Sequence, residues 1–239
     1  MAGTFHDGAQ PPPHEIADRE LPPVPGGWHQ RRFEIGGHTF SLWMPASPDE
    51  LLEGEEVLAR HLRDGYMPYW GYLWPASLEM AAAVLAQPWP NGMPALELGT
   101  GLGLVGIAGL SAGLDLLLTD YDETSLQAAR ANARLNGFPQ ASTARLDWRD
   151  PPGQEFPLIL GCELIYERGN HPLILHVLDR MLAPGGMAWL ADPGRHVAPE
   201  FLQRAASAGW SITTRALARL TFAGRPPGET FLHELRRTP

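Results

Sequence analysis

The segment Glu97-Leu98-Gly99-Thr100-Gly101-Leu102-Gly103 has the composition of a ligand-binding loop. It lies between a short apolar run and a helical pattern, and glycines at such a turn let the backbone approach a ligand at the helix N-terminus. The candidate cofactor-binding residues of this loop are Glu97, Gly99, Thr100, Gly101 and Gly103. The same glycines could instead serve tight helix–sheet packing, and with Gly106 they also fit the G-x-G-x-x-G dinucleotide fingerprint.

Acidic and aromatic side chains follow the next two predicted strands. Asp120, with Tyr121 beside it, comes after Leu114–Thr119, where a carboxylate can accept hydrogen bonds from both hydroxyls of a ribose. Asp147 and Trp148 come at the end of Thr143–Leu146, where they offer an acceptor for an exocyclic amine and a flat face for a purine. The pattern predicts a cofactor that contains a nucleoside.

A further acid follows the strand predicted at Leu158–Cys162. We expect Glu163 to hold an ammonium group or help deprotonate it, and Tyr166 to orient that group through a hydrogen bond or its ring face. Two structural roles compete with this interpretation, because Glu163 could cap the helix that follows and Tyr166 could pack against it. Cys162 is assigned to the cofactor pocket, as a small buried thiol rather than a nucleophile.

Three other conspicuous features have plainer interpretations. Trp74 is expected to form a wall of the cofactor pocket, although a tryptophan beside a helix start is equally typical of a core or an interface. Arg195 either recognises an acidic group of a substrate or closes a surface turn, and we favour the turn. We expect no metal site, because His171 and His176 are five residues apart and no His-Glu-x-x-His pattern occurs.

Short apolar runs alternate with amphipathic segments from Ala95 onward, which predicts a parallel sheet with helices on both faces. The predicted strands of this sheet are Ala95–Leu98, Leu114–Thr119, Thr143–Leu146, Leu158–Cys162 and Met187–Ala191. The predicted helices are Pro48–Arg63, Ala76–Ala86, Leu104–Ala112, Glu123–Asn136, Pro172–Leu182 and Pro199–Ala208. Ser211–Leu217 and Thr230–Leu235 have no helix between them, so we expect this last pair to be antiparallel.

The N-terminal part differs in composition from the alternating region. Residues 1–27 are rich in proline and poor in large apolar side chains, which predicts a disordered or extended arm. In residues 28–75 we expect a hairpin around Gly36-Gly37 and a helical lid, with Ser47 capping the helix that starts at Pro48. Residues 76–239 are expected to form the cofactor-binding domain.

The charge and the rare residues exclude several classes of protein. The 18 basic residues are all arginine, so chemistry that needs a lysine of this chain, such as a Schiff base or a Walker motif, is excluded. A formal net charge of -9 argues against nucleic acid as a partner. The single cysteine excludes an intramolecular disulfide, and with no signal-peptide or membrane-span pattern it predicts a cytoplasmic protein without a membrane partner. We expect a monomer or a weak oligomer.

Taken in order, these motifs resemble the class I, seven-β-strand S-adenosylmethionine-dependent methyltransferases. The shared features are the glycine loop with its leading acid, the acid after the second strand, the turn Leu182-Ala183-Pro184-Gly185-Gly186 and the reversed terminal hairpin. The resemblance covers about Trp70–Leu235. It implies an α/β, doubly wound, Rossmann-like sheet of seven strands that is mostly parallel, with S-adenosylmethionine as cofactor and S-adenosylhomocysteine as product.

A narrower resemblance concerns the acceptor of the methyl group. Trp70-Gly71-Tyr72-Leu73-Trp74-Pro75, Leu146-Asp147-Trp148 and Glu163-Leu164-Ile165-Tyr166 are similar to motifs of the protein-lysine methyltransferase branch that includes the electron-transfer-flavoprotein β-subunit lysine methyltransferase. That branch has Asp-x-x-Tyr after the fourth strand, so Glu163 keeps the charge and lengthens the side chain by one methylene. This departure bears on the target rather than on the reaction class.

Several functions remain open at this point. The main hypothesis is an N-methyltransferase that acts on a protein with an exposed lysine, and the net negative charge suits a cationic target surface. A second is a small-molecule N-methyltransferase that resembles nicotinamide N-methyltransferase and takes a small amine. A third is a non-catalytic cofactor-binding module, and an RNA methyltransferase is the remaining alternative.

Overall fold

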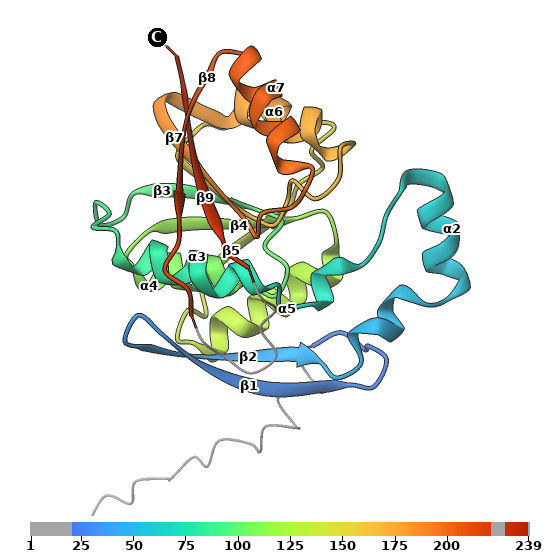
Figure 1. The fold of residues 1–239 in the computed structure, drawn as a ribbon. Helices are drawn as coiled ribbons and strands as arrows, with labels where there is room; N and C mark the ends of the chain where they lie inside the picture. Colours follow the sequence, from blue (N-terminus) through green and yellow to red (C-terminus); the bar gives the residue numbers. More distant parts are fainter. Residues whose placement is uncertain (1–20, 221–227, 239) are drawn as a thin grey trace, which may run out of the picture.

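The computed structural model describes residues 21–220 and 228–238, and its centre is a seven-stranded sheet (Figure 1). The strand order is β5-β4-β3-β6-β7-β9-β8. All neighbouring strands from β5 to β7 are parallel, whereas β9 is antiparallel to both β7 and β8. The strands are β3 (Pro94–Leu98), β4 (Asp115–Asp120), β5 (Ser142–Arg145), β6 (Phe156–Cys162), β7 (Leu182–Asp192), β8 (Trp210–Ala216) and β9 (Phe231–Arg237). The predicted doubly wound, mostly parallel sheet with a reversed terminal pair is confirmed.

Helices cover both faces of this sheet, which is why its central strands are apolar on both sides. On one face lie α3 (Pro75–Ala86), α4 (Leu104–Ser111) and α5 (Glu123–Leu135), and on the other lie α6 (Asn170–Met181) and α7 (Ala198–Ser207) (Figure 1). Leu96 and Leu98 pack in the core beside α6 and α7, while Leu158 and Leu160 pack in the core beside α3. The two cores hold the carboxyl ends of the parallel strands at one edge.

A two-stranded sheet of β1 (Trp28–Ile35) and β2 (His38–Pro45) lies against the helices of the first face. Its two-residue turn places Gly36 at φ 58° and Gly37 at φ 81°, a pair of positive values that glycine adopts without strain. The hairpin predicted around these two glycines is confirmed.

Asn132 of α5 and Asn136, the C-cap residue of that helix, fasten this hairpin to the body of the protein. The amide oxygen of Asn132 accepts from the Trp43 N–H at 2.6 Å, and its nitrogen donates to the Trp43 carbonyl at 3.1 Å. One turn later, Asn136 makes the equivalent pair of bonds to Ser41, at 2.9 and 2.7 Å. These bonds pair backbone groups of Ser41 and Trp43 on the free edge of β2. They also hold in place the end of the hairpin from which the chain continues toward the candidate site.

The prediction of one helix over Pro48–Arg63 is wrong. The segment forms a short 3-10 helix, η1 (Pro48–Leu52), and a separate helix, α2 (Glu55–Asp64). Gly54 lies between them at φ 123°, a conformation that interrupts any helix and that glycine alone tolerates readily. The predicted cap also fails, because the Ser47 side chain makes no capping hydrogen bond.

The Leu-Ala-Pro-Gly-Gly segment was predicted as a turn, but it is the first part of β7. Leu182 pairs with Phe156 of β6, and the register then shifts before Leu158 pairs with Met187. The irregularity accommodates Pro184 and the positive φ of 75° at Gly185 inside the strand. Gly137 follows the C-cap residue of α5 at φ 90°, and Gly209 follows the C-cap residue of α7 at φ 84°, the left-handed conformation that commonly ends a helix.

Residues 1–20 of the predicted arm lie outside the described residues. Leu21 and Val24 pack against the core of the hairpin, and Trp28 Nε1 donates to the Pro22 carbonyl at 2.8 Å. Across residues 21–220 and 228–238, none of the helices has the length and apolar character required to span a bilayer.

Candidate active site

A cavity of about 440 Å³ opens at the carboxyl edge of the parallel strands, where the loops after β3, β4, β5 and β6 meet the segment that precedes α3. The structure brings to it every candidate site residue except one: Trp74, Glu97, Gly99, Thr100, Gly101, Asp120, Tyr121, Asp147, Trp148, Cys162, Glu163 and Tyr166 line the cavity. Gly103 does not. A Cβ at Gly103 would lie 3.3 Å from Ala129, so its missing side chain serves the packing of α4 against α5.

The glycine loop is held in place by two carboxylates from adjacent strands. Asp120, at the end of β4, accepts from the Gly101 N–H at 3.0 Å and from the Ser125 hydroxyl at 2.8 Å. Glu97, at 3% exposure, accepts from the Thr100 hydroxyl at 2.5 Å. Burial raises the pKa of Glu97 to about 8 and also raises the pKa of Asp120. Glu97 is therefore largely protonated at neutral pH, and it bonds to Thr100 of its own loop while it also lines the cavity.

Gly99 and Gly101 form the part of the loop that faces the cavity, with φ values of 60° and 55°. A Cβ at Gly99 would meet Leu164 at 2.7 Å, and the ring of Trp148 lies 3.7 Å from the same point. No other residue type fits at Gly99 without displacing Leu164, which follows the strand end that carries Glu163. The conformation of the glycine loop at Gly99 and the position of Leu164 after β6 therefore depend on each other.

Arginines that the sequence reasoning missed surround the acid after β5. Arg149 donates to both oxygens of Asp147, at 2.8 and 2.7 Å, and its Nη2 also donates to the Tyr121 hydroxyl at 3.0 Å. The hydrogen bonds from Arg149 hold the pKa of Asp147 below its ordinary value. The guanidinium groups of Arg145 and Arg149 lie 4.9 and 5.2 Å from the Tyr121 ring centroid. Asp147 was predicted as an acceptor for an exocyclic amine, but it is already paired with Arg149. The arginine two residues later in the sequence could have indicated this pair.

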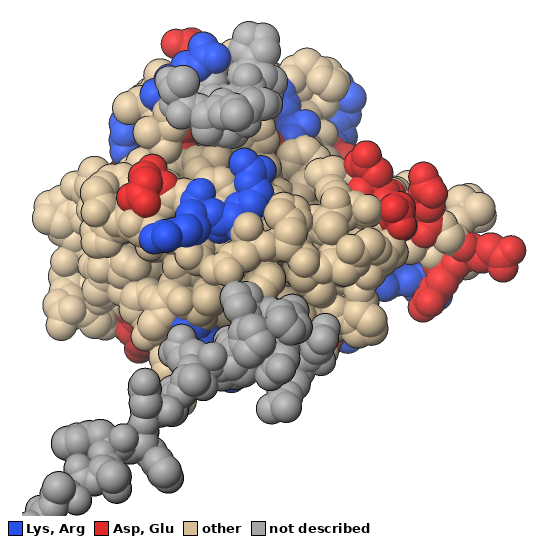
Figure 2. Space-filling view, turned by 90° about the horizontal axis from the view of Figure 1, so that it is seen from below, with Lys and Arg blue, Asp and Glu red and all other residues tan. Residues whose placement is uncertain are grey.

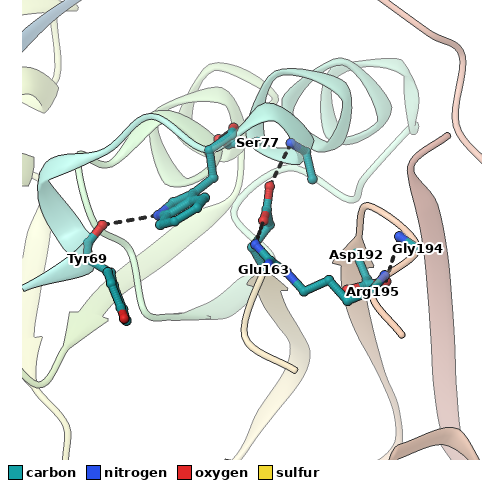
Figure 3. A network of polar contacts seen from close by, with 8 residues as sticks. Tyr69, Ser77, Glu163, Asp192, Gly194 and Arg195 are labelled. Carbon is teal, nitrogen blue, oxygen red and sulfur yellow. Dashed lines mark hydrogen bonds and ion pairs between the residues drawn. The ribbon is translucent and has the colours of Figure 1, made fainter. Parts of the chain in front are cut away.

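Glu163 sits where β6 ends, buried at 5% exposure and with a backbone φ of 55°. It is the one non-glycine residue with positive φ in the described ranges, and such strain typically requires about 1–3 kcal/mol of support from its surroundings. The support is visible in Figure 3, where Glu163 lies between the start of α3 and Arg195. Its Oε1 accepts from the Ala76 N–H at 3.0 Å, and its Oε2 accepts from Arg195 Nη2 at 2.5 Å.

These contacts change the structural role that the sequence suggested for Glu163. The helix that it caps is α3, which lies 87 residues earlier in the chain, rather than the helix that follows. The cap residue of α3 is Trp74, whose side chain makes no capping bond, so the Glu163 carboxylate satisfies that N-terminus instead. Burial raises the pKa of Glu163, while the bonds from Ala76 and Arg195 oppose that rise.

Arg195 is also placed differently from the expectation of a simple surface turn. Its backbone N–H does close a turn, as expected, by donating to Asp192 Oδ1 at 2.9 Å. Its guanidinium, however, points to Glu163 and lies 5.6 Å from the Trp74 ring and 5.9 Å from the Tyr166 ring. Nothing in the local sequence signals this long-range contact.

Aromatic side chains complete this corner of the cavity. Tyr69 contacts Trp74 and Tyr166 edge-on, with ring centroids 6.1 and 5.8 Å apart. Trp74 Nε1 donates to the Tyr69 carbonyl at 3.1 Å, which fixes the indole. Burial raises the pKa of Tyr166 to about 12, so its hydroxyl keeps its proton. Burial likewise raises the pKa of Cys162, which leaves a neutral thiol rather than a nucleophile.

Comparison with protein families gives one match over the core of this chain. The model of a family described as lysine methyltransferase matches residues 71–206. This range contains the glycine loop, both strand-end acids after β4 and β5, and the Glu163 corner with Arg195.

Individual relatives agree with that match over shorter stretches. EEF1A lysine methyltransferase 3 from Mus musculus is 32% identical over 122 residues, which are 48% of this chain and 52% of that protein. Protein N-lysine methyltransferase METTL21A from Mus musculus is 32% identical over 123 residues, 48% of this chain and 53% of that protein. The chain thus spans about half the length of these curated relatives.

Among solved structures, the ribosomal protein L11 methylase from Lactobacillus delbrueckii subsp. bulgaricus has the same fold, with a TM-score of 0.54 at 21% identity. The match covers 67% of this chain and 77% of that one.

Proposed function

Because this chain belongs to the lysine methyltransferase family, we propose that it transfers the methyl group of S-adenosylmethionine to the side-chain amine of a lysine in another protein. The names of the two mouse relatives support a protein substrate. From the motifs of Trp70–Pro75 and Glu163–Tyr166, we also propose kinship with the branch that includes the electron-transfer-flavoprotein β-subunit lysine methyltransferase.

The residues at the glycine loop fit S-adenosylmethionine. Gly99 and Gly101 leave the backbone open to the cavity, and a side chain at Gly99 would collide with Leu164. A carboxylate at the end of β4, Asp120, is suited to ribose hydroxyls, and the Trp148 ring offers a face for the adenine. The cavity volume of about 440 Å³ lies within the range of roughly 300–1,000 Å³ that is usual for cofactor sites.

The observation that carries the proposal is the cation already bound at the Glu163 corner. The guanidinium of Arg195 is held by the Glu163 carboxylate and lies near the rings of Trp74 and Tyr166. A carboxylate beside aromatic rings is a binding site for a charged nitrogen, and an ammonium group from a lysine has the same requirements. The corner is therefore suited to an amine acceptor.

The chemistry asked of this chain is mainly alignment and proton removal. When bound, S-adenosylmethionine supplies a methyl group on a sulfonium that an uncharged amine can attack in line. Glu163 holds the acceptor nitrogen in the corner and receives its proton, because burial raises the pKa of this carboxyl. Tyr166 remains protonated and orients the amine through its hydroxyl or ring face.

A transfer assay tests the proposal. The purified chain is incubated with methyl-labelled S-adenosylmethionine and a lysate of the source cells, and the products are separated by ultrafiltration into macromolecules and small molecules. The chain contains no lysine, so lysine methylation of the enzyme itself adds no background. We expect label on lysine in discrete protein bands. Glu163→Gln should lower the rate at least about 100-fold, because general acid–base roles are typically worth 10²–10⁴.

Glu163→Asp is the matched control, because it keeps the charge and removes only one methylene; it should retain more activity than Glu163→Gln. Label that passes the filter would favour a small-molecule acceptor, and label in nuclease-sensitive material would favour RNA. Absence of transfer to any fraction, together with measurable cofactor binding, would favour the non-catalytic module.

A further inference from the structure

Helix α2 carries the two large apolar side chains that are most exposed in the described residues. Leu58 is 58% exposed and Leu62 is 78% exposed, and they lie four residues apart on one side of the helix. Figure 1 shows α2 at the side of the molecule, apart from the sheet and its covering helices. Exposed leucines on a projecting helix indicate a surface that a partner covers.

A shallow groove runs along α2 toward the candidate active site. Its lining includes Leu52, Val57, Leu58 and His61 from the η1–α2 segment, together with Met67 and Tyr69. Met67 and Tyr69 also line the main cavity, so the groove and the cavity share a wall. A polypeptide in the groove could therefore place one of its side chains in the cavity.

An acidic border, formed by the start of α2 and the segment before it, adjoins the groove, and Glu55 of this border lines the groove. Asp49, Glu50, Glu53, Glu55 and Glu56 are all exposed, whereas the arginines of α2, Arg60 and Arg63, lie in the second half of the helix. In Figure 2 acidic side chains gather on the side of the molecule where η1 and α2 lie. Carboxylates at the start of α2 also suit the helix dipole, so the charge is compatible with a stable helix.

We propose that this α2 surface docks a basic, lysine-bearing segment of the substrate protein that also carries an apolar side chain for the groove. The inference rests on the proposed function. The acidic border attracts a positively charged segment, the exposed leucines bind its apolar residue, and the shared wall directs the target lysine toward Glu163.

The composition of the chain argues against a second copy as the occupant. The chain contains no lysine, so a second copy would offer no lysine amine to the site.

Two pairs of substitutions test the docking surface in the full chain. Leu58→Gln with Leu62→Gln removes the apolar contact, and Glu55→Gln with Glu56→Gln removes two charges. Asp115→Asn with Glu155→Gln is the charge-matched control, because both residues are exposed and lie at the amino ends of β4 and β6, opposite the cavity. The probes are synthetic fluorescent peptides with one central lysine and flanks that are arginine- and leucine-rich, arginine- and serine-rich, or aspartate- and leucine-rich.

We expect the arginine–leucine peptide to bind the wild-type chain about tenfold more tightly than the other two, as measured by fluorescence anisotropy. In the Leu58→Gln/Leu62→Gln variant, the arginine–leucine peptide should bind no more tightly than the arginine–serine peptide. In the Glu55→Gln/Glu56→Gln variant, the difference in affinity between the arginine–leucine and the aspartate–leucine peptides should be smaller than in the wild type. The charge-matched control should behave like the wild type. Equal binding of all three peptides, or unchanged discrimination in both α2 variants, would overturn the docking proposal.

Methyl transfer to the same peptides separates this proposal from the proposed function. Peptide binding that depends on α2 without any transfer to lysine would contradict the function and leave the docking surface standing. Transfer that is equally efficient in the wild type and in both α2 variants would support the function and overturn the docking surface. A dimer in sedimentation that the leucine substitutions dissociate would also overturn it, because the occupant would then be a second copy.

Discussion

The guanidinium of Arg195 lies 2.5 Å from the carboxylate of Glu163, although the two residues are 32 positions apart in the chain. The Glu163 side chain is almost completely buried, at 3% exposure, whereas the Arg195 side chain is 31% exposed. The ion pair therefore joins a buried acid to a partly exposed arginine from the loop that follows β7. A substrate amine that binds Glu163 must share the carboxylate with this guanidinium or displace it.

A lysine at position 195 should become a substrate. Arg195→Lys would introduce the only lysine of the chain next to Glu163. If the corner holds the acceptor amine, this variant should methylate itself on that lysine in the presence of S-adenosylmethionine. Intact-mass spectrometry followed by peptide mapping measures the modification.

The control for this experiment is Arg168→Lys, which places a lysine at an exposed position that is paired with Glu200. This lysine should stay unmodified. Equal methylation of both variants, or methylation of neither while each retains transfer activity, would show that the acceptor amine binds elsewhere.

The stability of the fold should fall as the pH rises through the titration of Glu97. Its pKa is about 8 in the folded protein and near 4.5 in the unfolded chain, so between these values the folded state holds a proton that the unfolded state releases. This contribution is fully present below about pH 4.5 and is lost as the pH approaches 8, with a slope of up to about 1.4 kcal/mol per pH unit.

Glu97→Gln mimics the protonated acid and should flatten that part of the dependence. Urea unfolding at several pH values between 5 and 8.5 gives the free energy of unfolding of both proteins. Parallel curves for the wild type and the variant would mean that Glu97 titrates normally in the folded state.

Gly106 should tolerate alanine less well than Gly109 in the same helix. A Cβ at Gly106 would lie 2.4 Å from Glu97 Oε2 and 2.8 Å from Leu118, both in the packed interface between α4 and the sheet. At Gly109 the nearest atom would lie 3.3 Å away. We expect Gly106→Ala to reduce the free energy of unfolding by about 1–3 kcal/mol, and Gly109→Ala to change it by less, because the gain of up to about 1 kcal/mol in helix propensity offsets the tighter contact. Equal Tm values for the two variants would contradict the close approach at Gly106.

Arg149 should tune cofactor affinity without affecting the chemical step. Arg149→Met removes both side-chain bonds to Asp147 and the bond to Tyr121, while the backbone N–H of residue 149 still donates to Asp147, so the pKa of Asp147 should rise toward its ordinary value. We expect the Kd for S-adenosylmethionine to increase about two- to fivefold and kcat to stay within twofold, since partly exposed pairs contribute about 1 kcal/mol or less. Arg130→Met, which removes an exposed pair with Glu123, is the control and should change neither constant. A fall in kcat with an unchanged Kd would place Arg149 at the acceptor instead.

Local sequence patterns predicted most of the helices and strands correctly, because these elements depend mainly on neighbouring residues. The apolar runs that became β3, β4 and β6 and the glycine turn of the hairpin each reflect preferences of a few neighbouring residues. Local patterns predicted one helix where Gly54 separates two. A glycine inside a helical pattern could have indicated this interruption. Local patterns also assigned the Leu182–Gly186 segment to a turn, because its pairing with β6 depends on a strand that lies elsewhere in the sequence.

The sequence by itself determined the order of strands and helices, the glycine loop and the positions of the acids at the strand ends, because chain connectivity places these residues at the carboxyl edge of any parallel sheet. Only the tertiary structure decided how these acids are used. Asp147 is bound to Arg149, Glu97 is buried beneath its own loop, and Glu163 caps α3 while it holds Arg195. These partners depend on burial and on contacts across the fold, and side-chain hydrogen bonds between distant segments leave no periodic signal in the sequence.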